Sequence, residues 1–267
     1  MDIMTGAGLL AGIIVIAVMM FMGGDLHMFI SEHAMIIIFG GSIAATMIRF
    51  PLGVMLHGLP LGAKFAFTMS RLSARDLVEE LARIAEIARK QGPVGLEKVE
   101  TDEPFLAKGI RYVADGYDLE FIRDNLERDR DNFLMHLDEG SKIYRAIGDC
   151  APAFGMIGTL VGLINLMFML GSGDMDLIGR SLAVALMTTF YGVLLANLIL
   201  KPVAVKLERR TEQRVALMNL VMQGISMMCN RRSPAYMRET LKSFIAHHDD
   251  EIRDGTPAAP RVRPQED

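Results

Sequence analysis

The side chains most able to do chemistry are hydroxyls and an amide inside two long apolar runs of the sequence. The first run opens near Pro152 and contains Thr159, and the second contains Thr188 and Thr189, followed by Asn197. Threonine hydroxyls can coordinate a cation or hold a water molecule. In helices the same hydroxyls often donate to a carbonyl of their own helix. Spacing alone leaves both roles open, and Pro152 fits either the first turn of a membrane helix or a kink.

Neither run contains Asp, Glu, Lys, Arg or His beyond its first residue or two. A pathway for protons or sodium normally needs an ionisable group at membrane depth. The chain therefore either conducts nothing or receives a carboxylate from a second polypeptide. We favour a partner that supplies this charge.

Four apolar runs predict four transmembrane helices. Hydrophobic residues make up 51% of the chain, and a spanning helix needs about 20 of them in sequence. The first run lacks the basic start of a signal peptide and is soon followed by another apolar run. The four runs cover 3–22, 33–48, 150–170 and 181–200.

The basic residues predict the orientation. Of the 28 Lys and Arg residues, 14 lie in 51–149 and 12 in 201–267, whereas the loop 23–32 has none. Segments rich in Lys and Arg stay in the cytoplasm. We therefore expect both termini and the central segment inside, with short outer loops at 23–32 and 171–180.

Small residues recur at helical spacing in the last two runs and predict closely packed helices. Such faces let helix backbones approach one another in lipid. The second run, with Gly40 and Gly41 followed by Ser42, predicts another close-packing face. The residues in the last two runs are Ala151, Gly155, Gly158, Thr159 and Gly162, then Ser181, Ala185, Thr188, Thr189, Gly192 and Ala196.

The central segment has helical apolar spacing and no period-two strand pattern, so it predicts a helical insert. We expect a helix near 63–71 after Pro60, and another that starts at Ser73 and stops at Gly92. Shorter helices are expected at 94–99 and 104–114.

Two long helices are expected to connect this insert with the apolar runs. One starts after Asp118 and continues into the third apolar run as a single rod. The other follows the fourth run, with a kink at Pro202. Ser233 and Pro234 then start a short helix, and charge and prolines from about Asp249 predict disorder.

Together these patterns predict an all-α, polytopic membrane protein with a helical cytoplasmic insert. Its predicted parts are transmembrane helices 1 and 2 (1–50), a cytoplasmic helical domain (51–149), transmembrane helices 3 and 4 (150–200), a cytoplasmic helical tail (201–248) and a disordered tail (249–267).

The sequence contains no catalytic or metal-binding constellation. The glycines lie inside apolar runs and not between a strand and a helix, so they do not form a phosphate-binding loop. Cys150 and Cys229 have no metal-ligand spacing and are expected as free thiols on the reducing side. His27 and His33 are interpreted as loop residues. We expect neither an enzyme nor a metal site, nor a nucleic acid partner.

Four segments resemble the flagellar stator proteins of the MotA/PomA family. They read GDCAPAFGMIGTLVGLI, MTTFYGVLLANLILKPVAVKLERR, GGSIAATMIRF and ARKQGPVGLEKVE. The resemblance covers about residues 1–245. ExbB/TolQ-type relatives share a looser form of the first motif but have three spans, so an energy-transducing subunit of that type is the alternative.

The resemblance implies a stator subunit in the bacterial inner membrane, which takes part in motility and chemotaxis. Five copies would surround two copies of a MotB/PomB-type partner, whose membrane helix carries the ion-binding aspartate. Ion flow, driven by the proton motive force or a sodium gradient, would turn the pentamer against the rotor switch protein FliG. No cofactor would be permanently bound, and membrane lipid would surround the subunit.

The resemblance also assigns residues. Pro152 and Pro202 match the family's two functional prolines. The chain resembles sodium-using members in having Thr at positions 159 and 189, so transported Na+ is favoured over H+. Thr188 is also expected in the ion pathway. The rotor contact is expected at Arg89, Lys90, Glu97, Lys98 and Glu100, with Lys98 at a position where some members carry an acid.

Overall fold

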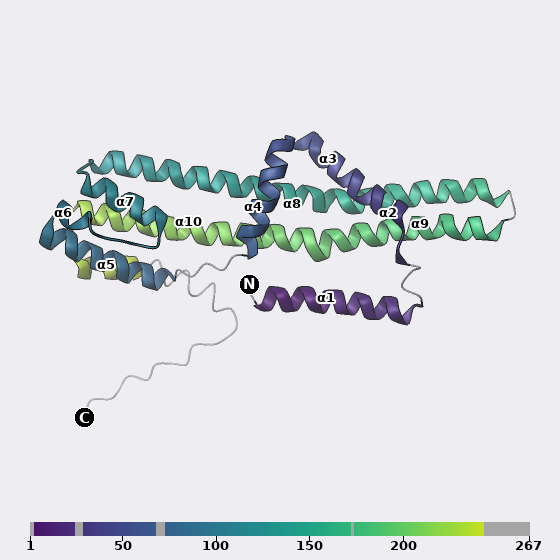
Figure 1. Ribbon diagram of the computed structural model, residues 1–267, viewed down its shortest axis with the longest axis horizontal. Coiled ribbons are helices and arrows are strands. Elements are labelled where there is room, and N and C mark those ends of the chain that lie inside the picture. Colours follow the sequence, from purple (N-terminus) through teal and green to yellow (C-terminus); the bar gives the residue numbers. More distant parts are fainter. Residues whose placement is uncertain (1–2, 25–28, 68–72, 172–173, 243–267) are drawn as a thin grey trace, which may run out of the picture. The chain divides into compact units, whose positions relative to one another are not determined.

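A computed structural model describes residues 3–24, 29–67, 73–171 and 174–242, and this part of the chain contains helices and no β-strand. The all-α prediction is therefore confirmed. The elements are α1 (Ile3–Met22), α2 (Glu32–Met35), the π-helix η2 (Ile36–Gly40), α3 (Gly41–Arg49), α4 (Leu52–Phe67), α5 (Ala74–Gln91), α6 (Pro93–Leu96), α7 (Pro104–Ala114), α8 (Leu119–Leu170), α9 (Met175–Leu194), the π-helix η3 (Leu195–Leu200) and α10 (Lys201–Cys229) (Figure 1).

The chain forms two compact units. Unit 1 comprises residues 1–70 and 131–214, and unit 2 comprises residues 71–130 and 215–267. Helices α8 and α10 each contribute residues to both units. The expected continuous helix from the insert into the third apolar run is confirmed, because α8 has 52 residues with Pro152 in its interior.

Unit 1 contains the helices that are apolar enough to cross a membrane. Two runs, Leu119–Leu170 and Met175–Cys229, meet the length and composition of a span. The segment Glu32–Arg49, taken together with Leu52–Ala66, is a third candidate, and Gly6–Met22 is a shorter apolar helix. Each of these four segments overlaps one of the four predicted runs, and the count of four spans stays a prediction.

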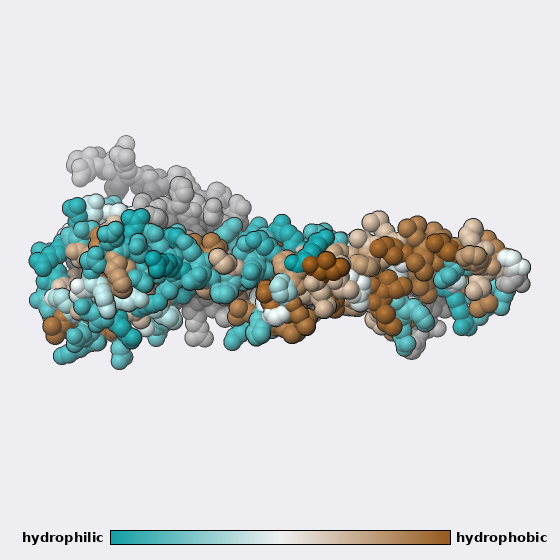
Figure 2. Space-filling view, turned by 90° about the horizontal axis from the view of Figure 1, so that it is seen from above, coloured by the Kyte–Doolittle hydropathy of each residue, from teal (hydrophilic) through white to brown (hydrophobic). Residues whose placement is uncertain are grey.

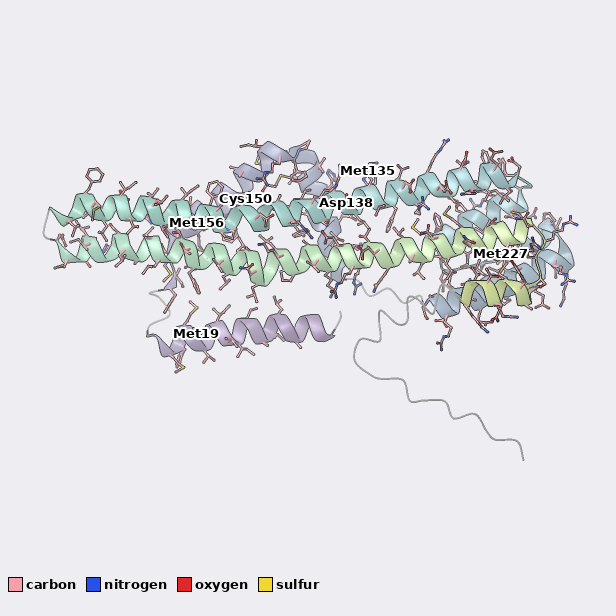
Figure 3. The ribbon with its side chains drawn as sticks, turned by 180° about the vertical axis from the view of Figure 1, so that it is seen from behind. Met19, Met135, Asp138, Cys150, Met156 and Met227 are labelled. Carbon is pink, nitrogen blue, oxygen red and sulfur yellow. The ribbon has the colours of Figure 1, made fainter. Side chains whose placement is uncertain are left out.

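The surface of these helices is mostly apolar. Met156 and Phe168 on α8 are 61% and 80% exposed, and Leu186 on α9 is 61% exposed. Figure 3 labels Met156 on α8, and hydrophobic side chains gather over the apolar segments in the space-filling view (Figure 2). A lipid environment accounts for this exposure, since water would leave a large apolar patch uncovered.

Helix α4 begins earlier than the sequence indicates. We expected Pro60 to precede a helix near 63–71, whereas α4 starts at Leu52 and contains Pro60 in its interior. Packing overrides the proline here, because Gly58 and Gly62 bring α4 against Ile143 and Tyr144 of α8. The axes of Glu32–Arg49 and Leu52–Ala66 meet at 113°, and Pro51 lies at the break.

Two π-helical turns interrupt the apolar helices. The turn η2 joins α2 to α3, and η3 lies directly before Lys201 and Pro202. A proline cannot donate the helical hydrogen bond of its own turn, and a π-turn absorbs an extra residue in a helix. The helical run Met175–Cys229 is continuous through Pro202.

Local sequence signals set the helix ends of unit 2. The Ser73 hydroxyl accepts from the Arg75 backbone N–H at the start of α5, and Gly92, with φ of 68°, ends it. Helix α7 has the predicted bounds. Helical residues continue at 234–242, where the Ser233 hydroxyl accepts from the Tyr236 N–H.

The core of unit 2 is formed by apolar side chains at helical spacing on several helices. Fully buried members are Leu81, Ile84, Leu106, Ile122, Leu126 and Ile225. Gly109 and Gly224 provide the space for Ile225 and Leu81, respectively. The helix that follows the fourth apolar run thus contributes Ile225 to this core.

Candidate functional site

Small residues join α8 and α9 at very short range. A β-carbon on Gly158 would lie 2.6 Å from the Thr188 Cβ, and one on Gly162 would lie 2.6 Å from the Ala185 Cβ. On α9, a β-carbon on Gly192 would lie 2.6 Å from the Ala151 carbonyl oxygen. The predicted close packing of these spans is confirmed, and each glycine is required because no side chain fits at its position.

Thr188 lies inside this helix–helix contact. Its side chain is fully buried, and its hydroxyl donates to the Ala185 carbonyl at 2.8 Å. Of the two roles that the sequence leaves open, this geometry corresponds to a threonine bonded to its own helix.

Thr159 and Thr189 lie on the margin of the contact. Both side chains are half-buried. The Thr159 hydroxyl donates to the Met156 carbonyl of its own helix at 2.6 Å, whereas the Thr189 hydroxyl donates across the contact to the Gly155 carbonyl at 3.4 Å. A hydroxyl oxygen that donates one hydrogen bond keeps its lone pairs for a cation or water. These two positions retain the chemistry that an ion path requires.

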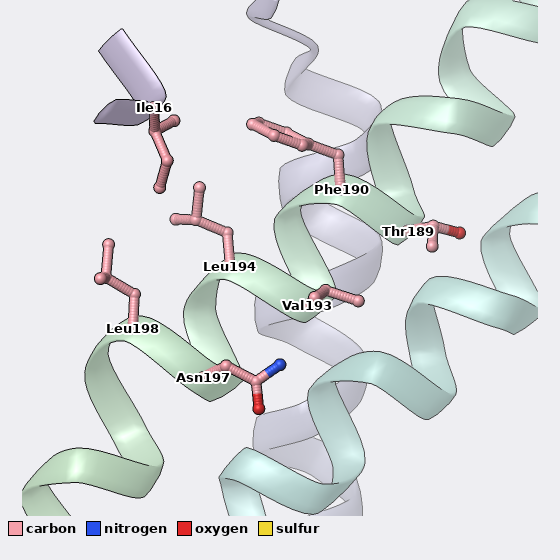
Figure 4. A pocket seen from close by; sticks show the side chains of 7 residues that line it. All are labelled: Ile16, Thr189, Phe190, Val193, Leu194, Asn197 and Leu198. Atoms are coloured by element: carbon pink, nitrogen blue, oxygen red, sulfur yellow. The ribbon is translucent and has the colours of Figure 1, made fainter. Parts of the chain in front are cut away.

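Next to Thr189 is an open pocket of about 520 Å³. Asn197 is exposed at its edge (Figure 4). A second exposed amide, Asn165 on α8, was not singled out in the sequence analysis. Its position inside an apolar run could have identified it as a candidate polar group. The pocket is lined by Ile16, Thr189, Phe190, Val193, Leu194, Asn197 and Leu198.

Pro152 lies beside a layer where three elements meet. Ile38 of η2, Ala151 of α8 and Ala196 of η3 are fully buried against one another. The Phe154 ring fills the space above Gly41, where any β-carbon would overlap it. Both π-turns and Pro152 therefore meet at one level, where the backbone hydrogen bonding of the helices is weakest.

Below this layer, ion pairs join α8 to α10. Arg145 donates to both carboxylate oxygens of Glu208, at 2.8 and 2.7 Å, and Lys201 lies 3.4 Å from Asp149. The Tyr144 hydroxyl donates to the Leu59 carbonyl at 2.7 Å, and desolvation raises the pKa of this phenol. These charges lie just outside the apolar runs, as expected at a membrane edge, because Arg145 and Asp149 precede the third run and Lys201 and Glu208 follow the fourth.

Tyr191 is a second residue that the sequence did not single out. Its hydroxyl accepts from the Ser31 N–H at 3.1 Å and donates to the Phe29 carbonyl. This side chain fixes the backbone that enters α2 to the last turn of α9. A buried tyrosine usually finds such a partner, but the sequence does not indicate which one.

The five expected rotor-contact residues lie together on unit 2. Arg89 and Lys90 lie in the last turn of α5, and Glu97, Lys98 and Glu100 follow α6. All five side chains are exposed. Lys90 pairs with Glu86 at 2.7 Å, and this hydrogen bond lowers the pKa of the Glu86 carboxyl. Gly92 joins the two pairs at a positive φ, so the turn brings opposite charges to one corner.

Within the residues that the structure describes, no group of three or more His, Cys, Asp or Glu side chains could hold a metal ion. His27 and the predicted disordered tail lie outside this described part. Cys150 and Cys229 are free thiols, as expected.

Comparison with known proteins identifies relatives by sequence. The model of the MotA/TolQ/ExbB proton channel family matches residues 97–220. Chemotaxis protein PomA of Vibrio alginolyticus is 34% identical over 245 residues, which are 92% of this chain and 96% of PomA.

Two solved structures share the fold. MotAB of C. jejuni gives a TM-score of 0.83 at 21% identity, covering 95% of this chain and 100% of that one. The flagellar MotAB stator complex from Bacillus subtilis gives 0.81 at 24% identity, covering 93% of this chain and 98% of that one.

Proposed function

The chain belongs to the MotA/PomA group of the MotA/TolQ/ExbB proton channel family, and from this premise we propose that it is a flagellar motor stator subunit. In this role it couples inward ion flow across the inner membrane to torque on the rotor. The observation that carries the proposal is the α8–α9 pair, which is apolar, closely packed and free of Asp, Glu, Lys, Arg and His over 150–170 and 181–200.

The missing charge is supplied by a partner. A MotB/PomB-type subunit, present in two copies inside a homopentamer of this chain, brings the ion-binding carboxylate. An uncharged surface of small and hydroxyl residues suits a helix that must turn past this carboxylate, because it offers polar contacts without a fixed counter-charge that would hold the ion.

Sodium is the favoured ion. The hydroxyl oxygens of Thr159 and Thr189 lie half-buried on facing helices, and oxygen ligands suit a hard cation such as sodium. Swimming that persists with a protonophore, but stops when a sodium ionophore collapses the sodium gradient, is the expected result. The reverse pattern would assign the proton.

The orientation follows from the basic residues, with both termini and unit 2 in the cytoplasm. Unit 2 then presents Arg89, Lys90, Glu97, Lys98 and Glu100 to the rotor protein FliG. Complementary charges at such a surface set the association rate and register more than the affinity.

Thr159→Ala tests the ion pathway directly. In a strain whose own gene is deleted, this variant is expected to lower swimming speed while it still assembles with its partner in the membrane. Thr46→Ala is the matched control, because Thr46 lies in another predicted span and its hydroxyl also donates to a carbonyl of its own helix, that of Ser42, at 2.7 Å. Equal swimming of both variants, at equal protein level, would contradict the pathway.

The family also includes ExbB/TolQ-type subunits, which would serve another ion-driven membrane complex. Deletion of the gene separates the two roles. Loss of swimming with flagella still assembled supports the stator, whereas intact swimming with impaired nutrient import supports the alternative.

A further inference from the structure

We propose that the outward face of α4 is a lipid-binding surface, which lies in the headgroup region of the membrane. The apolar residues of this face are Leu52, Leu56, Pro60 and Leu61, all exposed, and the exposed His57 and Lys64 lie on the same side. Its assignment to the cytoplasmic leaflet rests on the orientation proposed above, whereas its contact with lipid does not.

The opposite face of α4 packs against the rest of unit 1. Met55 and Ala66 are buried. A β-carbon on Gly62 would lie 3.0 Å from Leu207 of α10, and one on Gly58 would lie 3.2 Å from Ile143 of α8. Together with the hydrogen bond from Tyr144 to the Leu59 carbonyl, these contacts fix which side of α4 faces outward.

The outward face is mostly apolar. Leu52, Leu56 and Leu61 are 53%, 64% and 51% exposed, and the exposed His57 and Lys64 lie on the same side at helical spacing. The apolar residues of a helix face must be covered. Leucines next to polar side chains suit the membrane interface, where lipid covers the leucines while the headgroups and water meet the polar groups.

The geometry places α4 along a membrane plane. The helix direction changes by 113° between Glu32–Arg49 and Leu52–Ala66. Helix α4 therefore lies 23° from perpendicular to the segment that contains the second predicted span (33–48), because 113° exceeds a right angle by that amount. Membrane helices tilt by about 20° from the bilayer normal on average. A helix almost perpendicular to a spanning segment therefore lies in the interface, where apolar faces insert by about 5–10 Å.

The apolar surface is continuous from the span into α4. Ile48, in the last turn of α3, is 88% exposed, and Leu52 follows directly after the break. Arg49 lies between them and is exposed. A cation at this point matches the level of the lipid phosphates, whereas a protein partner would have to pair it.

Pro60 limits how deeply α4 can insert into the membrane. It cannot donate to the Leu56 carbonyl, which lies one turn earlier on the outward side. In the hydrocarbon core an unsatisfied carbonyl costs several kcal/mol, whereas the headgroup region provides water. These features favour the interface over deep insertion, and lipid over a second copy of the chain.

The absence of tryptophan from the sequence allows a direct test. Single variants Leu56→Trp and Leu61→Trp are reconstituted as full chains, with the partner, in vesicles of phosphatidylcholine and phosphatidylglycerol. Lipids brominated near the headgroup or near the chain end then quench the fluorescence. Met19→Trp on the apolar helix α1, where Met19 is 69% exposed, and exposed Tyr236→Trp on unit 2 are the controls.

The proposal expects both the Leu56→Trp and the Leu61→Trp variant to lose most of their fluorescence in lipid brominated near the headgroup, and less with deep bromines. Stronger quenching by deep bromines would overturn the interfacial placement. Blue-shifted emission without quenching would assign the face to a second copy, and red emission quenched by aqueous iodide would assign it to water. If Met19→Trp is not quenched either, the membrane placement of α1 fails, which is a separate failure from that of α4.

Discussion

Gly158 shows at the residue scale why the α8–α9 contact depends on glycine. A β-carbon there would lie 2.6 Å from the Thr188 Cβ and Oγ1. Because both helix backbones are held by neighbouring contacts, neither can move apart without losing them. The close approach is therefore a property of single positions along the two helices.

Gly158→Ala is expected to destabilise the folded chain by about 1–3 kcal/mol, the usual cost of overpacking. Thermal or denaturant unfolding in detergent measures this change. Gly179→Ala on α9 is the matched control, because its β-carbon meets nothing within 4 Å and alanine favours the helix by about 1 kcal/mol. A Gly158→Ala variant as stable as the control would contradict the short contact.

Tyr191→Phe is expected to cost about 1–3 kcal/mol, since the Ser31 N–H and the Phe29 carbonyl lose their shared partner. Hydrogen exchange at the Ser31 amide should accelerate. Tyr236→Phe serves as the control, because the contact of Tyr236 with Arg232 is made by the ring, which phenylalanine keeps. Unchanged exchange at Ser31 would show that the hydroxyl contributes nothing there.

Cys229 offers a prediction about pH. Burial raises the pKa of its thiol, because desolvation disfavours the charged thiolate. In a Cys150→Ala background, the rate of alkylation should therefore reach half its maximum at a higher pH in the folded chain than in the denatured chain. Equal midpoints would contradict this effect.

At the scale of elements, the turn between α5 and α6 determines where the charged corner lies. Gly92 has φ of 68° and ψ of −162°, a region that is essentially restricted to glycine. Its conformation sets Arg89 and Lys90 of α5 beside Glu97 and Lys98, and no other residue type holds this turn without strain.

Gly92→Ala is expected to cost about 1–3 kcal/mol and to accelerate hydrogen exchange in the last turn of α5. If the corner contacts the rotor, the variant should also reduce swimming torque. Val94→Ala is the control, because Val94 is 66% exposed and its backbone is helical. The strain argument would fail if both variants behaved alike.

At the scale of the whole molecule, the orientation that we propose rests on the uneven distribution of Lys and Arg. In a chain without Cys150 and Cys229, Asp176→Cys at the start of α9 should react with a membrane-impermeant maleimide added to intact cells. Glu97→Cys should react only after the cells are permeabilised. Labelling of Glu97→Cys in intact cells would overturn the placement of unit 2 in the cytoplasm.

The sequence by itself determined several of the helices and of their ends. Apolar runs, the N-caps at Ser73 and Ser233, the stop at Gly92 and the long helix through Pro152 follow from local periodicity and backbone chemistry, and the structure confirms them. It also indicated that small residues would form a helix–helix contact, because their spacing places them on one face.

Only the tertiary structure decided which partner each side chain meets. It separates buried Thr188 from half-buried Thr159 and Thr189, shows that Tyr191 holds the Ser31 backbone, and extends α4 back through Pro60. These outcomes depend on contacts between residues far apart in the chain, for example Gly62 with Tyr144 and Leu207. Periodicity describes one helix at a time, and it carries no information about the helix that packs against it.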